Sequence, residues 1–247
     1  MIAFENITLH QGKKFVLNNV SFTIGQSERV AILGGSGEGK TTILKLIMRL
    51  IQPDEGKIII DGEDITDLAE KKLTEKRMKL GIVFQDGALF DSMNVRENVA
   101  FYLREHTNLS ESLIRKKVSE LLDVVAMSGT EELMPEELSG GMQRRIAIAR
   151  SLTASEPKMF LYDEPTSGLD PVSTAKISQL ILSLAVHGKG FVIVTHEIPV
   201  ALKTAQRFIF LNNGSICFDG NKNEFLKSTN QNLNEFLNNW REQRPMG

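Results

Sequence analysis

The sequence has a single cysteine among its 247 residues, Cys217. One cysteine cannot form an internal disulfide, so we expect a protein of a reducing compartment. Cys217 lies in a strand-like stretch, Ser-Ile-Cys-Phe at residues 215–218. We therefore interpret it as a core thiol rather than a reactive one.

Long apolar runs and a strong charge of one sign are also absent from the sequence. No apolar run approaches the roughly 20 residues that a membrane-spanning helix needs. The opening residues, Met-Ile-Ala-Phe-Glu, lack the basic start of a signal peptide. The formal net charge of -2 gives no electrostatic reason to expect nucleic acid as a partner. We expect a cytoplasmic protein whose association with any membrane comes through a partner.

The strongest positive signal lies between Glu28 and Leu50. Arg29–Leu33 is a short apolar run typical of a buried strand, and apolar residues recur at helical spacing from Ile43 onward. Between them, G-G-S-G-E-G-K-T at positions 34–41 matches the phosphate-loop pattern G-x-x-x-x-G-K-[ST]. The glycines let backbone N–H groups turn toward phosphate oxygens, and the helix adds the positive end of its dipole.

Two side chains of this loop have distinct expected roles. Lys40 supplies a positive charge for the β- and γ-phosphates, and the hydroxyl of Thr41 is placed to hold Mg²⁺. The alternative is a glycine-rich turn that happens to precede a lysine, and the strand and helix on either side disfavour it. We predict that the nucleotide phosphates bind at Gly34, Gly35, Ser36, Gly37, Glu38, Gly39, Lys40, Thr41 and Thr42.

Two adjacent carboxylates end a second apolar strand, at Asp163 and Glu164. Ligands of parallel α/β sheets bind at the carboxyl ends of the strands, so this pair should face the phosphate loop. Asp163 can then hold Mg²⁺, and Glu164 can orient or deprotonate a water that attacks the γ-phosphate. Taken alone, the pair also fits the start of an ordinary turn.

A second glycine-containing helix start lies about 100 residues after the first, at Leu138–Met142. Ser139 is a good N-cap residue, and Gly140 and Gly141 leave helix N–H groups uncovered, as an anion site requires. A plain capped helix start fits these residues equally well.

The chain is predicted to be one α/β domain, residues 1–247, in which a helical insert interrupts the core. An N-terminal antiparallel β-subdomain leads into the phosphate loop, and strand patterns return near residues 158–162, 191–195 and 208–211. Residues 95–152 show helical periodicity and no convincing strand. We predict a core at 1–84 and 158–220, an insert at 85–157 and a tail at 221–247.

Two further stretches, one charged and one amphipathic, are expected to be helices. The charged segment Leu68–Lys79 has interleaved acidic and basic residues and is predicted to be a solvated surface helix. In the tail, Leu233, Phe236, Leu237 and Trp240 recur at i, i+3, i+4 and i+7. The apolar face of that tail helix can pack on its own domain or on a partner, and the sequence leaves both open.

Together the motifs resemble those of the ATP-binding subunits of ABC transporters, over nearly the whole chain. The similar segments, in chain order, are Walker A (34–41), the Q-loop glutamine (Gln85), the signature motif (138–142), Walker B with its glutamate (160–164), the D-loop (Ser167–Asp170) and the switch histidine (His196).

The resemblance implies a P-loop NTPase fold of the ABC type that hydrolyses ATP with Mg²⁺ as a head-to-tail homodimer. Each ATP would lie between the Walker A loop of one copy and Ser139, Gly140 and Gly141 of the other, with Asp170 nearby. The family pattern also implies catalytic roles for Glu164, His196 and Gln85, and metal contacts from Thr41, Gln85 and Asp163.

Two positions depart from the family pattern. Met142 replaces the glutamine that usually ends the signature motif, and we expect little effect because its side chain lies past the N–H groups that contact phosphate. Gln11 occupies the place of the aromatic residue that usually stacks on adenine. His10 and Phe15 are nearby candidates, and the contact is left unassigned.

A narrower resemblance, to the lipid-transport ATPases of the Mla/Mce type (the MlaF subunits), is carried by residues 85–106 and 133–142. It implies phospholipid cargo and an MlaE-like integral-membrane permease. It further implies a possible Mce-domain lipid-binding protein, a possible STAS-domain subunit and a location on the inner face of the cytoplasmic membrane. Leu89, Phe90 and Met93 would face the permease, although a core role for one or two of them is about as probable.

Two other functions stay open at this point. An ATPase subunit of an importer for amino acids or metal ions would differ only in its partner. Soluble ABC proteins of DNA repair or translation usually carry two nucleotide domains or a long coiled-coil insert, and the sequence has neither.

Overall fold

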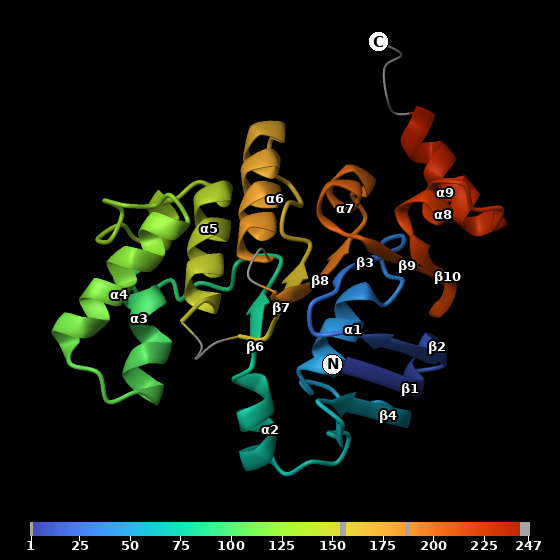
Figure 1. The fold of residues 1–247 in the computed structure, drawn as a ribbon, viewed down its shortest axis with the longest axis horizontal. Coiled ribbons are helices and arrows are strands. Elements are labelled where there is room, and N and C mark those ends of the chain that lie inside the picture. Colours follow the sequence, from blue (N-terminus) through green and yellow to red (C-terminus); the bar gives the residue numbers. More distant parts are fainter. Residues whose placement is uncertain (1, 154–156, 186–187, 243–247) are drawn as a thin grey trace.

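The computed structural model of the protein describes residues 2–153, 157–185 and 188–242, and contains two β-sheets (Figure 1). The smaller sheet is antiparallel, with the strand order β2-β1-β4-β5. Side chains from Val20 to Ile24 in β2 alternate between buried and exposed, because one face of the strand packs on the core and the other meets water. Its strands are β1 (Ile2–Gln11), β2 (Lys14–Ile24), β4 (Glu55–Ile60) and β5 (Glu63–Asp64).

The larger sheet holds the phosphate-loop strand near its centre, in the order β10-β9-β3-β8-β7-β6. Its strands pair in parallel except for β9 and β10, which form an antiparallel hairpin. β7 and β8 are buried along their whole length, which explains their continuous apolar character. The strands are β3 (Arg29–Leu33), β6 (Leu80–Val83), β7 (Met159–Asp163), β8 (Gly190–Thr195), β9 (Arg207–Asn212) and β10 (Ser215–Asn221).

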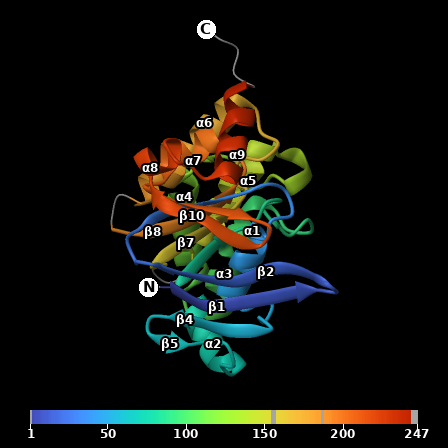
Figure 2. The same ribbon diagram turned by 90° about the vertical axis from the view of Figure 1, so that its right-hand side faces the viewer.

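Helix α1 (Lys40–Ile47) lies between the two sheets (Figure 2). Its apolar residues Ile43 and Leu44 are buried with Phe4 of β1 and Ile32 of β3 in one cluster. Packing from both sides therefore fixes the start of the helix, where the phosphate loop ends. The remaining helices of the core and tail are α2 (Glu70–Arg77), α6 (Pro171–Ala185), α7 (Ile198–Thr204), α8 (Lys222–Leu226) and α9 (Gln231–Glu242).

A helical layer stands at the β6 edge of the larger sheet, on the left in Figure 1. Asn94 starts its first helix with a reciprocal cap, since the Glu97 amide donates to its side chain and the Glu97 carboxylate accepts from its amide. The described part of residues 95–151 contains no strand. The layer consists of α3 (Val95–His106), α4 (Glu111–Val124), a single 3₁₀ turn (Pro135–Glu137) and α5 (Gly140–Ser151).

The expected fold class, an α/β P-loop core with an antiparallel β-subdomain and a helical insert, is confirmed. The predicted surface helix is shorter than expected, at Glu70–Arg77, and β10 extends through Asn221 into the segment assigned to the tail. Sequence reasoning did not foresee β5 or α8. The proposed division at residues 85, 158 and 221 remains a prediction.

Two further expectations have structural outcomes. Cys217 is half-buried in β10 and packs against the core. The tail helix α9 packs on its own domain, because Leu233 and Leu237 are fully buried and Phe236 lies 5.1 Å from the Phe210 ring. Among the described residues, no helix is both long enough and apolar enough to cross a membrane.

Candidate functional site

The phosphate loop leaves the start of α1 without a side-chain cap. Gly39, the N-cap residue, has a φ of 91° and has no side chain that could accept a hydrogen bond from the first N–H groups of the helix. A Cβ at this position would lie 2.8 Å from the carbonyl oxygen of Val16, so only glycine fits. The first N–H groups of α1 are thus available to an anion, which the helix dipole also favours.

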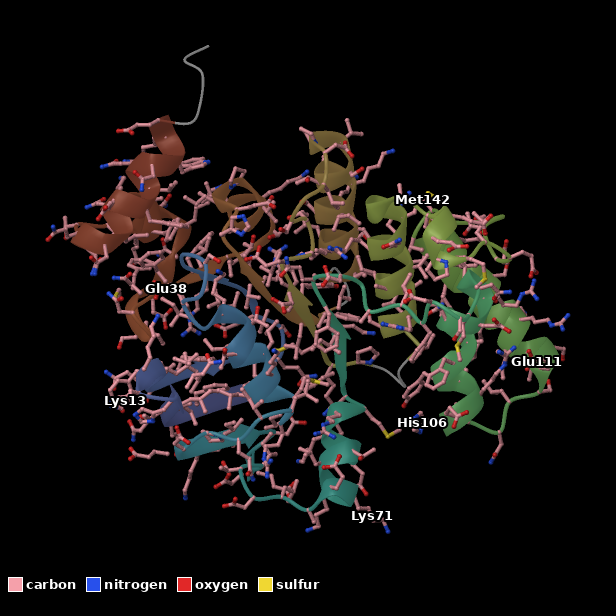
Figure 3. All side chains as sticks on the ribbon, turned by 180° about the vertical axis from the view of Figure 1, so that it is seen from behind. Lys13, Glu38, Lys71, His106, Glu111 and Met142 are labelled. Atoms are coloured by element: carbon pink, nitrogen blue, oxygen red, sulfur yellow. The ribbon has the colours of Figure 1, made fainter. Side chains whose placement is uncertain are left out.

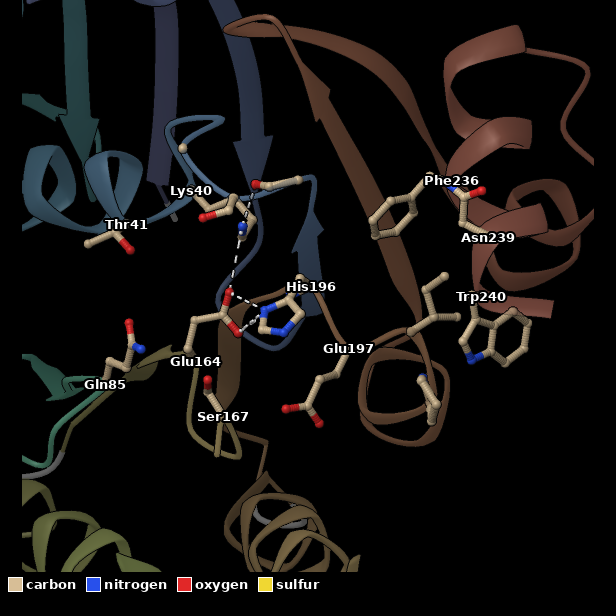
Figure 4. A pocket seen from close by; sticks show the side chains of 15 residues that line it. Lys40, Thr41, Gln85, Glu164, Ser167, His196, Glu197, Phe236, Asn239 and Trp240 are labelled. Atoms are coloured by element: carbon tan, nitrogen blue, oxygen red, sulfur yellow. Dashed lines mark hydrogen bonds and ion pairs between the residues drawn. The ribbon is translucent and has the colours of Figure 1, made fainter. Parts of the chain in front are cut away.

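Lys40 places a buried cation inside this loop. The residue is 6% exposed, and its Nζ donates to the carbonyl oxygens of Gly34 (3.1 Å) and Gly35 (2.8 Å). Nζ also lies 3.6 Å from Oε1 of Glu164 (Figure 4). A buried ammonium held by carbonyls and one carboxylate is suited to binding a further, strongly anionic group.

Asp163 and Thr41 meet where β7 ends opposite α1. The Thr41 hydroxyl donates to Oδ1 of Asp163 over 2.8 Å. Burial raises the pKa of the Asp163 carboxyl, opposed by the bond from Thr41 and by the charges of Lys40 and Lys45, and Glu164 raises it further. A buried carboxylate beside a hydroxyl is an all-oxygen donor set, which fits Mg²⁺ and disfavours softer metals.

Glu164 has a left-handed backbone, with a φ of 44°. Its amide donates to the Val194 carbonyl (2.9 Å), which ties the strained residue to β8. The carboxylate is almost fully buried and lies 3.0 Å from Nδ1 of His196, whose side chain is half-exposed. Lys40, Glu164 and His196 therefore form one chain of polar contacts across the mouth of the site (Figure 4).

These groups line one cleft of about 930 Å³. Of the predicted site residues, it contains Gly35, Ser36, Gly37, Lys40, Thr41, Gln85, Glu164 and His196. Sequence reasoning assigned no role in this cleft to its remaining lining residues. These are Ser167, Glu197, Ile198 and Pro199, together with Phe236, Asn239 and Trp240 of α9.

The other loop residues lie around the cleft rather than in it. Gly34 is buried beneath the loop, where a Cβ would approach the Leu211 carbonyl oxygen to 2.7 Å. Glu38 lines a separate hollow with the β9–β10 turn. Gly39 and Thr42 line a hollow of about 250 Å³ together with Gln11 and Phe15. Of the two candidates for the adenine contact, Phe15 lines this hollow, whereas His10 packs against the Phe15 ring and does not line it.

The predicted signature residues and Asp170 do not line the cleft, whereas Ser167, at the other end of the D-loop, does. Ser139 caps α5 by accepting a bond from the Met142 amide (3.3 Å). Asp170 caps α6 by accepting from the amide of Ser173 (3.0 Å), and hydrogen bonds from the side chain and amide of Ser173 lower the pKa of Asp170.

The starts of α5 and α6 pack closely against each other. A Cβ on Gly140 would lie 3.3 Å from Leu169, and one on Gly141 would lie 3.1 Å from Ser173. Figure 3 shows Met142 and Glu38 well apart, with α6 between them. One copy of the chain therefore does not bring the start of α1 and the start of α5 to a common ligand.

Comparison with known proteins places this geometry in a family. The model of the ABC transporter family matches residues 17–167. The intermembrane phospholipid transport system ATP-binding protein MlaF of Haemophilus influenzae is 37% identical over 96% of this chain and 90% of its own length. The probable ribonucleotide transport ATP-binding protein mkl of Mycobacterium tuberculosis is 42% identical over 96% of this chain and 66% of its own length.

A solved structure shares the fold. It is a dimeric ATP-binding cassette in a post-hydrolysis state, bound to ADP and Pi, with a TM-score of 0.82 and 36% sequence identity. The match covers 90% of this chain and 98% of that one. The chain thus belongs to the ABC transporter family, as one of its ATP-binding and ATP-hydrolysing subunits.

Proposed function

We propose that two copies of the chain close head to tail around two ATP molecules and hydrolyse them. The support is the separation of two complementary helix starts within one copy. The α1 start has buried charges and an open cleft, whereas the Ser139–Gly141 start has a dipole and N–H groups but is far from that cleft. A second copy turned head to tail would supply the missing half.

Different residues at the cleft have different roles in hydrolysis. The N–H groups at the α1 start and the Lys40 ammonium bind the β- and γ-phosphates. Glu164 accepts a proton from the attacking water or orients it, and His196, hydrogen-bonded to Glu164, contacts the γ-phosphate. Thr41, Asp163 and Gln85 would hold Mg²⁺, which neutralises charge on the phosphates. The contact chain Lys40–Glu164–His196 is the observation that carries this assignment.

We also propose that the surface around Phe90 docks on a membrane permease. Phe90 is 40% exposed and packs against Phe101 of α3, with the ring centroids 4.8 Å apart. Both line a hollow of about 450 Å³ whose walls come mainly from α2, β6, α3 and α5. Buried Asn98 holds this surface in shape, since its side chain accepts from the Phe90 amide (2.8 Å) and donates to the Met93 carbonyl (2.8 Å). Leu89 and Met93 are half-buried, whereas Phe90 is exposed.

Phe90→Asp tests this docking. A charge at an apolar contact costs a few kcal/mol, so the membrane-bound fraction of the protein should fall on the order of 10- to 100-fold. Val124→Asp is the matched control, because Val124 is a similarly exposed apolar residue (53%) at the end of α4, a different part of the same helical layer. Equal release by both variants, or by neither, would contradict docking at Phe90.

For cargo, we propose phospholipid. The support is the similarity to MlaF, whose name specifies intermembrane phospholipid transport, and the resemblance in residues 85–106 and 133–142. An MlaE-like permease, an Mce-domain lipid-binding protein and a STAS-domain subunit would complete the assembly. The chain would then sit on the inner face of the cytoplasmic membrane. The name of mkl specifies ribonucleotide transport, so ribonucleotide is the second candidate for the cargo.

Deletion of the gene separates these cargoes. Loss of phospholipid transport should change the lipid composition of the envelope and raise detergent sensitivity, with normal growth on limiting amino acids, metals or nucleosides. A nutrient-uptake defect with an intact barrier would contradict the lipid assignment. Co-purification from membranes would identify the partner subunits in the same cells.

A further inference from the structure

A strained turn separates Gln85 from the Phe90 surface. Gly87 and Ala88 have φ values of 72° and 48°, so two successive residues adopt the left-handed conformation. A residue with a Cβ rarely does so, and Ala88 has no polar side chain to stabilise it locally. The turn therefore depends on contacts with its surroundings.

Arg150, in the last turn of α5, makes those contacts. Its Nη1 donates to the Ala88 carbonyl (2.8 Å), and its Nη2 donates to the Gly87 carbonyl (2.9 Å). The same guanidinium lies over the Phe90 ring, 5.5 Å from its centroid. One planar fork thus holds both left-handed residues, a geometry that an ammonium does not reproduce.

The clamped turn lies between two functional segments. Gln85 comes just before it and lines the nucleotide cleft, and Phe90 comes just after it. The opposite end of α5 carries Ser139, so the helix that ends in the clamp begins at the signature motif. We propose that Arg150 is a positioning residue, which fixes Gln85 in the cleft by holding the Gly87–Ala88 turn on α5. The inference rests on the proposed role of Gln85.

The chain contains its own matched control. Arg145, five residues earlier in α5, donates Nη1 to the Ala126 carbonyl (2.7 Å). Ala126 is also left-handed, with a φ of 54°. Burial lowers the pKa of both guanidinium groups. Arg145 therefore repeats the chemistry of the clamp in another part of the helical layer, away from Gln85.

The test compares Arg150→Lys with Arg145→Lys in the full-length purified protein. Lysine keeps the charge but offers a single ammonium nitrogen in place of the two nitrogens of the planar fork, each of which holds one carbonyl. For Arg150→Lys we expect kcat for Mg-ATP to fall on the order of 10-fold, with KM within about 2-fold, while Arg145→Lys stays near the native rate. Adding Ala88→Gly should restore most of the loss, because glycine adopts the left-handed turn without a clamp. A general weakening of α5 would not be rescued in this way.

Hydrogen exchange without nucleotide gives a readout that does not depend on turnover. Exchange at residues 86–90 should be faster in Arg150→Lys and return toward native with Ala88→Gly. Native exchange or native kcat in Arg150→Lys, or no rescue by Ala88→Gly, would overturn the inference. Native turnover in Gln85→Ala, with faster exchange in Arg150→Lys, would refute the proposed role of Gln85. The hold of Arg150 on the turn would still be supported.

Discussion

Helices α1 and α5 both have glycine at their starts, but their surroundings differ. Gly39 leaves the N–H groups of α1 without a side-chain cap, whereas Ser139 caps α5 through the Met142 amide. A buried cation and two buried carboxylates stand near α1. Two glycines open α5, where the closest groups to their missing side chains are Leu169 and Ser173. The first start can hold a charged ligand and a metal, and the second can only add to a ligand held elsewhere.

The largest effect on ATP turnover is expected from a substitution near the start of α1. Glu164→Gln keeps the shape of the side chain but removes the charge that activates water. ATP should still bind, while turnover falls by about 10²- to 10⁴-fold. The variant should accumulate as an ATP-bound dimer in size-exclusion chromatography. Native turnover would remove Glu164 from this role, and binding of a fluorescent ATP analogue checks that the site is intact.

Breaking the α5 side should leave ATP binding by each copy unchanged. Ser139→Arg adds bulk where the partner copy's γ-phosphate would lie. Since misplacement of about 1 Å can cost 10²-fold in rate, hydrolysis should fall by about that factor and ATP-driven dimerisation should be lost. Ser139→Ala is the control, because it removes the cap but keeps the N–H groups. Normal hydrolysis by Ser139→Arg would exclude a sandwiched site.

The smallest effects are expected from two carboxyl groups whose pKa values are shifted in opposite directions, Asp163 and Asp170. Burial raises the pKa of Asp163 in the folded protein, so the fold is favoured when this carboxyl is protonated. That contribution to stability is complete below the pKa of the unfolded chain and is lost as pH rises through the raised folded-state pKa. Asp163→Asn stays neutral and keeps an acceptor for Thr41. Without nucleotide it should therefore melt higher than the native chain at pH 7, by about 2–4 °C per kcal/mol recovered. This gain should shrink toward pH 4.

Asp170 should respond with the opposite sign. Hydrogen bonds lower its pKa, so it stabilises the fold above its unfolded pKa, and that contribution is lost on acidification. Asp170→Asn should lower the melting temperature at pH 7. A fall in melting temperature for Asp163→Asn, or a rise for Asp170→Asn, in thermal scans at pH 4–8 would contradict the assigned causes.

Local patterns account for the part of the site that the sequence predicts. The phosphate loop and the Asp163–Glu164 pair each lie within a few consecutive residues, and each is placed by the strand or helix beside it. Periodicity likewise predicts α9 from Leu233 to Trp240. It does not indicate where that helix packs, because its partner Phe210 lies in another strand.

Conformation and long-range contacts account for what the sequence does not predict. Nothing local distinguishes Arg150 from Arg145, since both are half-buried arginines on the same helix. Only the approach of the Gly87–Ala88 turn separates them. The left-handed backbone of Glu164 is equally non-local, because it is supported by β8. β5, with two residues, is too short to show a period.

The position of α9 also has a spectroscopic consequence. Trp240 is the single tryptophan of the chain, and it lines the same cleft as Lys40 and Glu164 (Figure 4). Indole emission excited near its red edge therefore comes from one known place in this cleft rather than from an average over the molecule. Its wavelength shifts with local polarity, so the protein carries an intrinsic, label-free optical probe of whether its cleft is filled.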